Sequence, residues 1–221
     1  MLQRENMPFS IGNIRRSRSV ELLASLVMLI RVVAFVDFRT TFGLIFYLLF
    51  AVVLLTAVRV VTAENHHRII AYFLATIWLA IGVVRFATQY ESLQIFAHLL
   101  FIVFCFFCVS VILRRIVVAK EVDFEVVCSS VSAYLLIAIL WAVSYDLFYF
   151  LNPETFSLTE GGAKLTFKHF IYFSLTTITT LGYGDITPVS VPVGIWSTFE
   201  AVTGVFYMAV LVARLVSVYR G

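Results

Sequence analysis

The stretch Thr179–Asp185, which reads TTLGYGD, decides how the rest of the chain is interpreted. It follows an apolar run from Phe167 to Ile178 that is too short to cross a bilayer. Side chains and carbonyl groups alternate in direction along an ordinary strand, whereas left-handed backbone at every second residue turns successive carbonyls the same way. Glycine adopts that backbone without steric cost, and Gly182 and Gly184 have the required spacing. The stretch therefore predicts a row of parallel carbonyl groups.

Such a row can replace the water around a cation, whose transfer into a low-dielectric interior costs on the order of 20 kcal/mol in the idealised limit. Residues 180–184 resemble the selectivity filter of tetrameric potassium channels, whose common form is Thr-Val-Gly-Tyr-Gly. The chain departs from that form at Leu181, a side chain expected to point away from the pore. The resemblance implies that this segment binds K+, with the Thr180 hydroxyl at the inner site. The filter residues are then Thr180, Leu181, Gly182, Tyr183 and Gly184.

The composition is that of a bilayer protein. Of the 221 residues, 62% are hydrophobic and 13% are charged, whereas soluble domains carry about 25% charged residues. The net charge of +3 is modest and the basic residues lie at segment ends, which argues against a nucleic-acid partner. Burial is favoured over a metal or redox role for Cys105, Cys108 and Cys128. No nucleotide-binding, zinc or catalytic-triad spacing occurs in the sequence, so neither enzymatic activity nor an organic cofactor is predicted.

Six stretches approach the roughly 20 apolar residues that a spanning helix needs. The sequence therefore predicts an all-α membrane protein with a reentrant pore helix and filter between the fifth and sixth spans. Residues 1–20 are interpreted as a cytoplasmic basic leader, residues 21–118 as a four-helix domain and residues 124–221 as the pore domain. The predicted spans are residues 21–38, 42–61, 69–87, 93–118, 124–150 and 193–219.

The distribution of charge in the connecting segments predicts the topology. Basic residues gather in the leader and in the links 59–68 and 114–120, while the links 37–41 and 89–92 carry little positive charge, with Arg39 their only basic residue. Both termini are therefore expected in the cytoplasm, with the filter facing outward. The loop 152–166 is expected to form an outer turret, whose acids raise the cation concentration at the mouth or are simply solvated.

Several residues beside the filter are expected to support it. The pore helix should begin near residues 166–167 and end at Thr179, with its C-terminal partial negative charge toward the cavity. Asp185 is expected to accept a hydrogen bond from Tyr172 of the same subunit, the alternative being a plain charge at the mouth. Thr176 and Thr179 belong to the same supporting group.

Two residues of the last span are also candidates. Glu200 is an acid within the membrane, expected behind the filter near Ser174 or Thr176. It either braces the filter or couples pH to the filter's conformation. Gly204 lies midway along the span, where inner helices of this superfamily bend, and it is either a gate hinge or a site of close packing against the pore helix.

The resemblance is strongest over residues 124–219, where the chain is similar to bacterial potassium channels. One filter per chain implies four copies around an axis, because a single copy cannot encircle an ion. The resemblance implies passive K+ flow across a bacterial inner (plasma) membrane, with K+, lipid and three further copies of the chain as partners. Residues 93–113 carry no Arg or Lys, so strong voltage gating is not expected. A less selective cation channel and a non-conducting membrane sensor or scaffold are the alternatives. The sequence predicts no particular gating stimulus or regulatory partner.

Overall fold

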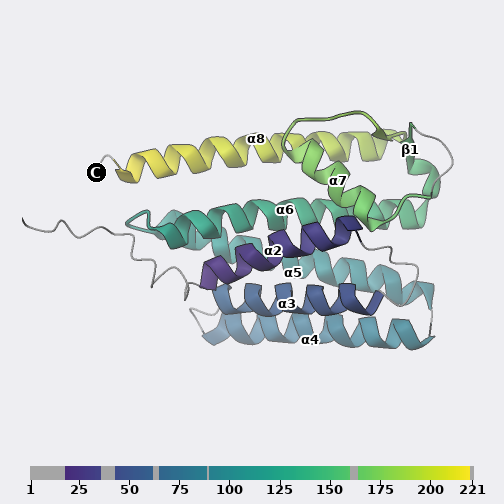
Figure 1. Cartoon of the computed structure of the whole chain (residues 1–221), viewed down its shortest axis with the longest axis horizontal. Helices are drawn as coiled ribbons and strands as arrows, with labels where there is room; N and C mark the ends of the chain where they lie inside the picture. The colour runs from purple at the N-terminus through teal and green to yellow at the C-terminus, as the bar shows by residue number, and fades with distance from the viewer. Residues whose placement is uncertain (1–17, 36–42, 62–64, 89, 160–163, 220–221) are drawn as a thin grey trace, which may run out of the picture.

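The structure is a computed structural model that describes residues 18–35, 43–61, 65–88, 90–159 and 164–219. Within these ranges it is mostly helical, with six long helices and one short one (Figure 1). Their bounds are α2 Arg18–Phe35, α3 Gly43–Val61, α4 Asn65–Thr88, α5 Glu91–Val118, α6 Phe124–Leu151, α7 Phe167–Ile178 and α8 Val191–Tyr219. Each of the six predicted spans overlaps one long helix, with residues 36–38 and 42 outside the described residues, and that all six cross a membrane stays a prediction. Most of the predicted leader lies outside the described residues, and its last three residues open α2.

Among the described residues, three helices are long and apolar enough to cross a membrane. They comprise Ser92–Val118 of α5, Phe124–Leu151 of α6 and Val191–Arg214 of α8. Two shorter apolar stretches, Phe50–Val60 and Ile69–Val84, lie in α3 and α4. The chain is therefore a helical protein with at least these three candidate spans.

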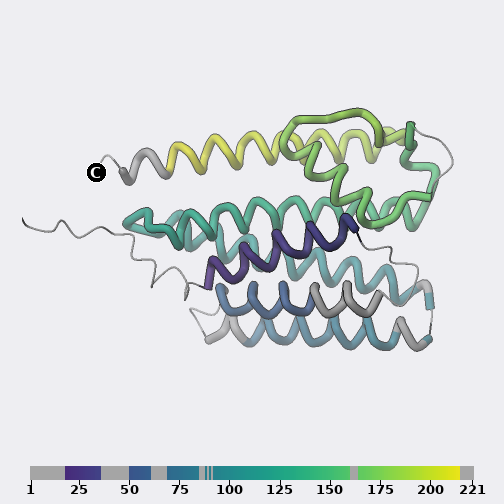
Figure 2. Tube along the Cα trace, viewed as in Figure 1, coloured from purple at the N-terminus to yellow at the C-terminus, as the bar shows by residue number. Residues whose placement is uncertain are grey.

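Helix α6 occupies the centre of the arrangement. It packs against α2 and α5 on one side and against α7 and α8 on the other (Figure 1). Helices α3 and α4 lie farther out, beyond α2 and α5. Figure 2 shows α7 and α8 on the opposite side of α6. Consistent with this placement, 61% of the most apolar stretch of α6 is buried, whereas only 11% of the corresponding stretch of α8 is buried.

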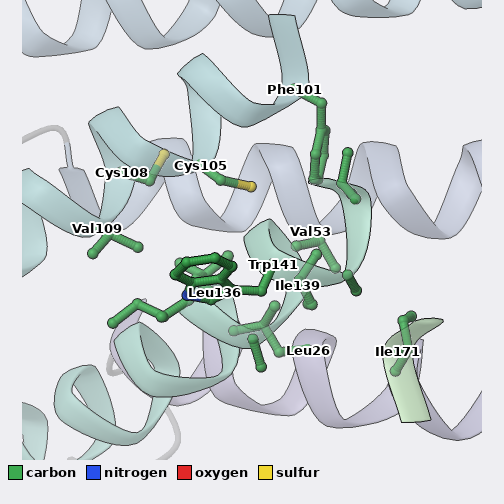
Figure 3. Packing of buried hydrophobic residues seen from close by; sticks show 14 of the residues in the cluster. Leu26, Val53, Phe101, Cys105, Cys108, Val109, Leu136, Ile139, Trp141 and Ile171 are labelled. Atoms are coloured by element: carbon green, nitrogen blue, oxygen red, sulfur yellow. The ribbon is translucent and has the colours of Figure 1, made fainter. Parts of the chain in front are cut away.

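A continuous apolar core joins helices α2, α3, α4 and α5 to α6. On α2, residues 22, 26, 29 and 33 recur at helical spacing and are buried. Side chains from α3, α5 and α6, among them Val53, Phe101 and Trp141, belong to the same cluster (Figure 3). Cys105 and Cys108 are 1% and 0% exposed, and Cys128 is 4% exposed, so the prediction that all three thiols are buried is confirmed. All three are free.

Polar contacts also connect α5 to α6 and α8. The Nε2 atom of His98 in α5 lies 2.7 Å from Oδ2 of Asp146 in α6. The other ring nitrogen, Nδ1, lies 2.6 Å from the carbonyl oxygen of Gln94. Near the far end of α8, Arg214 donates hydrogen bonds to the carbonyl oxygens of Val117 and Ala119, at 3.1 and 2.6 Å. The last turns of α5 are thus bound directly to α8.

A small sheet appears where the sequence predicted only a turret. After the 3-10 turn Pro153–Thr155, strand β1 (Phe156–Leu158) pairs antiparallel with β2 (Ile186–Pro188). The pairing is extended by hydrogen bonds from Val189 N to Thr155 O at 2.8 Å and from Thr159 N to Asp185 O at 2.9 Å. The all-α prediction overlooked this element because each strand is three residues long and its partner is distant in sequence. The sheet ties the turret to the segment that follows the filter.

Candidate functional site

Helix α7 carries the candidate site at its C-terminal end. Thr166 is its N-cap and forms a capping box with His169, whose Nδ1 accepts from Thr166 N at 3.0 Å. At the other end Thr179 is the C-cap, and its hydroxyl donates to Leu175 O at 2.6 Å. The helix therefore begins and ends where the sequence predicted. Its last carbonyl groups are turned toward the segment that follows.

The backbone of that segment alternates in handedness. Thr180, Gly182 and Gly184 have φ values of +60°, +49° and +78°. The sequence predicted left-handed backbone at the two glycines but not at Thr180. For a residue with a Cβ atom, this conformation costs about 1–2 kcal/mol. The Thr180 amide is held by a 2.9 Å hydrogen bond to Thr177 O. Left-handed residues at every second position form the pattern that turns successive carbonyls to one side.

The amide groups of the segment are bound to the end of the pore helix. Leu181 N and Gly182 N both donate to the carbonyl oxygen of Thr176, at 2.8 and 3.1 Å. Gly184 O accepts from the hydroxyl of Thr159 at 3.3 Å. By contrast, within the described part of the chain no donor meets the carbonyl oxygens of residues 180–183. Because residues 180–183 are exposed, their four successive carbonyls are available to a partner outside this single chain.

Two tyrosines and an acid stand beside this backbone. The rings of Tyr172 and Tyr183 are stacked, with centroids 6.4 Å apart and planes 6° apart. A hydrogen bond between the Tyr172 hydroxyl and the Asp185 carboxylate raises the pKa of the tyrosine. Asp185 Oδ1 also accepts from Ile186 N at 3.1 Å. The side chains of Tyr172 and Asp185 thus join α7 to the end of the segment 180–184 within one chain.

A buried polar cluster lies on the other side of α7. Glu200 of α8 is 0% exposed, and its Oε2 accepts from the Tyr145 hydroxyl of α6 at 2.7 Å. Its Oε1 is hydrogen-bonded to Ser174 Oγ of α7. Thr176, the other expected neighbour, makes its side-chain hydrogen bond to Phe173 O instead, at 2.9 Å. The carboxyl group therefore links three helices.

Sequence reasoning missed the partner that α6 supplies to Glu200. That partner is Tyr145, and the neighbouring Ser144 makes a separate contact to α8, in which it accepts from the indole Nε1 of Trp196 at 3.0 Å. The adjacent hydroxyl side chains of Ser144 and Tyr145 within an apolar stretch could have indicated such contacts, because polar groups inside a membrane usually bind one another.

Gly204 lies directly against the end of the pore helix. A Cβ atom there would be 2.0 Å from the carbonyl oxygen of Ile178 and 2.8 Å from its Cγ1. The same carbonyl oxygen accepts from the Tyr134 hydroxyl of α6 at 3.1 Å. Helix α8 continues unbroken through this position. The geometry thus accounts for the glycine by close packing, while a hinge role stays a prediction.

These elements coincide with the region that matches known proteins. Residues 134–220 match the protein family described as "Ion channel", a range that contains most of α6, all of α7, the filter segment and α8. This part of the chain is therefore similar to ion-channel domains.

One protein that this chain resembles is named as a potassium channel. Over 71 residues the chain is 32% identical to "Two-pore potassium channel 2" of Arabidopsis thaliana. The aligned part covers 32% of this chain and 15% of the length of that relative. No solved structure matches the chain.

Proposed function

We propose that the protein is a passive, potassium-selective channel, with K+ bound by the backbone carbonyls of Thr180, Leu181, Gly182 and Tyr183. The observation that carries this proposal is the left-handed backbone at every second residue, from Thr180 to Gly184, with four successive carbonyls unpaired in the described chain. The amides of the same segment are directed to the pore helix, so the carbonyls are free to replace water around an ion. The Thr180 hydroxyl then faces the innermost ion position.

Selectivity for K+ over Na+ is part of the proposal. Tyr183 stacks on Tyr172, which braces the filter laterally, and Asp185 braces its outer end through the same tyrosine. The plant relative is named as a potassium channel, which supports potassium as the permeant ion. Tyr183 also matches the tyrosine in the Thr-Val-Gly-Tyr-Gly form of potassium channels, which the resemblance implies favours potassium.

Four copies of the chain are proposed to surround one axis. In the single chain, residues 179–185 are exposed throughout, as are most of the apolar residues along α8. One chain has one such segment, and an ion path needs carbonyls on all sides. Neighbouring copies would cover both exposed regions, with six spans per copy and both termini in the cytoplasm. Because α5 lacks basic residues over 93–113, strong voltage gating is not part of the proposal.

Ion flux through the purified chain in liposomes tests the proposal. The full chain should admit K+ in preference to Na+, and Ba2+ should block the K+ flux. Two matched glycine variants sharpen the assay: Gly182→Ala alters a residue at positive φ, whereas Gly194→Ala places a methyl group in open space. Flux should be lost in the first and kept in the second.

The outcomes separate the alternatives. Equal K+ and Na+ flux would indicate a less selective cation channel. A tetramer with no Ba2+-sensitive flux at any voltage, pH or Ca2+ concentration tested would indicate a sensor or scaffold. A protein that is monomeric in lipid would overturn the proposed assembly.

A further inference from the structure

The buried cluster behind the pore helix contains one hydrogen too few for an ionised Glu200. Ser174 Oγ lies 2.7 Å from the carbonyl oxygen of Ala138 and is also hydrogen-bonded to Oε1 of Glu200. A serine hydroxyl has one proton to donate, and a carbonyl oxygen can only accept. Ser174 therefore donates to Ala138 O, and the proton between Ser174 and Glu200 must come from the glutamic acid.

The second carboxyl oxygen agrees with this count. Tyr145 donates its phenolic proton to Oε2 of Glu200 at 2.7 Å. A neutral carboxylic acid can donate through one oxygen and accept at the other. An ionised Glu200 would take the Ser174 proton instead, which would leave Ser174 Oγ and Ala138 O facing each other without a hydrogen between them. Glu200, Ser174 and Tyr145 are all 0% exposed, so water cannot fill that gap.

We propose that Glu200 is held as a neutral carboxylic acid that positions the pore helix, and that its ionisation at alkaline pH loosens this contact and reduces conduction. The conduction part rests on the proposed channel function. An isolated charge in such a site is strongly disfavoured. The titratable groups facing Glu200 are the phenols of Tyr145 and Tyr134, both from α6. On α7 the group in contact is Ser174, which does not titrate in this range.

The path from Glu200 to the filter is short. Ser174 lies two residues before Thr176, whose carbonyl oxygen holds the amides of Leu181 and Gly182. A shift of Ser174 therefore moves the anchor of the filter backbone. Glu200 acts through Ser174 and does not contact the ion, so it is a positioning residue.

Infrared difference spectroscopy of the full chain in lipid tests the protonation state without any need for conduction. At neutral pH the spectrum should contain a carbonyl band of a protonated carboxylic acid, and Glu200→Gln should remove it. The matched control is Glu154→Gln, an exposed acid of the turret, which should leave that band in place. The same band in wild type and Glu200→Gln would overturn the proposal, whatever the channel does.

A second variant keeps the test decisive if Glu200→Gln fails to fold. Tyr145→Phe removes the donor to Oε2 but keeps the ring that packs on Phe173, with centroids 5.0 Å apart. The acid band should persist and shift in frequency, since one of its hydrogen bonds is gone. A band that does not shift would show that the absorbing group is not the acid bound by Tyr145.

The pH dependence of K+ flux tests the consequence. Once Glu200 begins to ionise at alkaline pH, its neutral fraction falls by about tenfold for each further pH unit. Wild-type K+ flux should therefore fall by up to about tenfold per pH unit. Gln cannot ionise and can still donate to Ser174, so Glu200→Gln should lose the alkaline fall. An equal fall in both proteins would overturn the pH-dependent role. Absence of flux in wild type would contradict the proposed function alone and leave the infrared result to decide the state of Glu200.

Discussion

Replacing Gly204 with alanine tests how closely α8 packs on the pore helix. The added methyl carbon would lie 2.0 Å from Ile178 O, whereas carbon and oxygen atoms make favourable contacts at roughly 3.5 Å. The two helices must therefore separate locally by more than about 1 Å. The clash is with a backbone atom, so no change of side-chain rotamer can relieve it.

The expected loss of stability combines two opposing effects. Overpacking costs about 1–3 kcal/mol, and alanine recovers about 1 kcal/mol of helix propensity relative to glycine. Because the 2.0 Å approach is to a backbone atom, the overpacking cost should lie at the upper end of that range. We therefore expect Gly204→Ala to lose about 2 kcal/mol, and more if the Ile178–Tyr134 hydrogen bond also breaks. Thermal unfolding and oligomer dissociation of the purified protein in detergent measure this loss. The matched control is Gly194→Ala on the same helix, where nothing lies within 4 Å of the new Cβ, and its stability should be equal to wild type or higher.

A compensating variant separates packing from bending. Gly204→Ala combined with Ala201→Gly restores a flexible glycine about one turn away but keeps the clash with Ile178. If close packing is the role of Gly204, the double variant should remain as unstable as Gly204→Ala or become less stable. Recovery of K+ flux in the double variant would support a hinge instead. A Gly204→Ala protein as stable as Gly194→Ala would refute the packing argument altogether.

Three other changes probe the filter and its supports. Gly182→Ala forces an L residue to φ +49° and should cost about 1–2 kcal/mol locally and abolish K+ flux while the chain still folds. Tyr172→Phe removes the hydrogen bond to Asp185 and should speed the loss of conduction during sustained opening, and unchanged single-channel records would count against that brace. A double-mutant cycle of His98→Gln and Asp146→Asn should give a coupling of about 1 kcal/mol in thermal unfolding, and additive effects would show that the pair contributes nothing.

Properties set by short stretches could be predicted from the sequence. The bounds of α7 follow from a capping threonine before an apolar run and from the glycines after it. Burial of Cys105 and Cys108 follows from their position in a long apolar helix. The left-handed backbone at Gly182 was predictable because glycine spacing is a local signal, whereas Thr180 carries no such signal and is held left-handed by the contact of its amide with Thr177 O.

Contacts between distant helices were decided only by the tertiary structure. The sequence placed Glu200 at the depth of Ser174, but it could not identify Tyr145 as the second partner or supply the proton count that follows from Ala138. It left hinge and packing open at Gly204, and the position of the Ile178 carbonyl favours packing. Hydropathy and residue spacing determine which segments become helices and which backbone a glycine allows. They do not determine how those helices are rotated and shifted against one another, and that placement decides which buried polar groups meet.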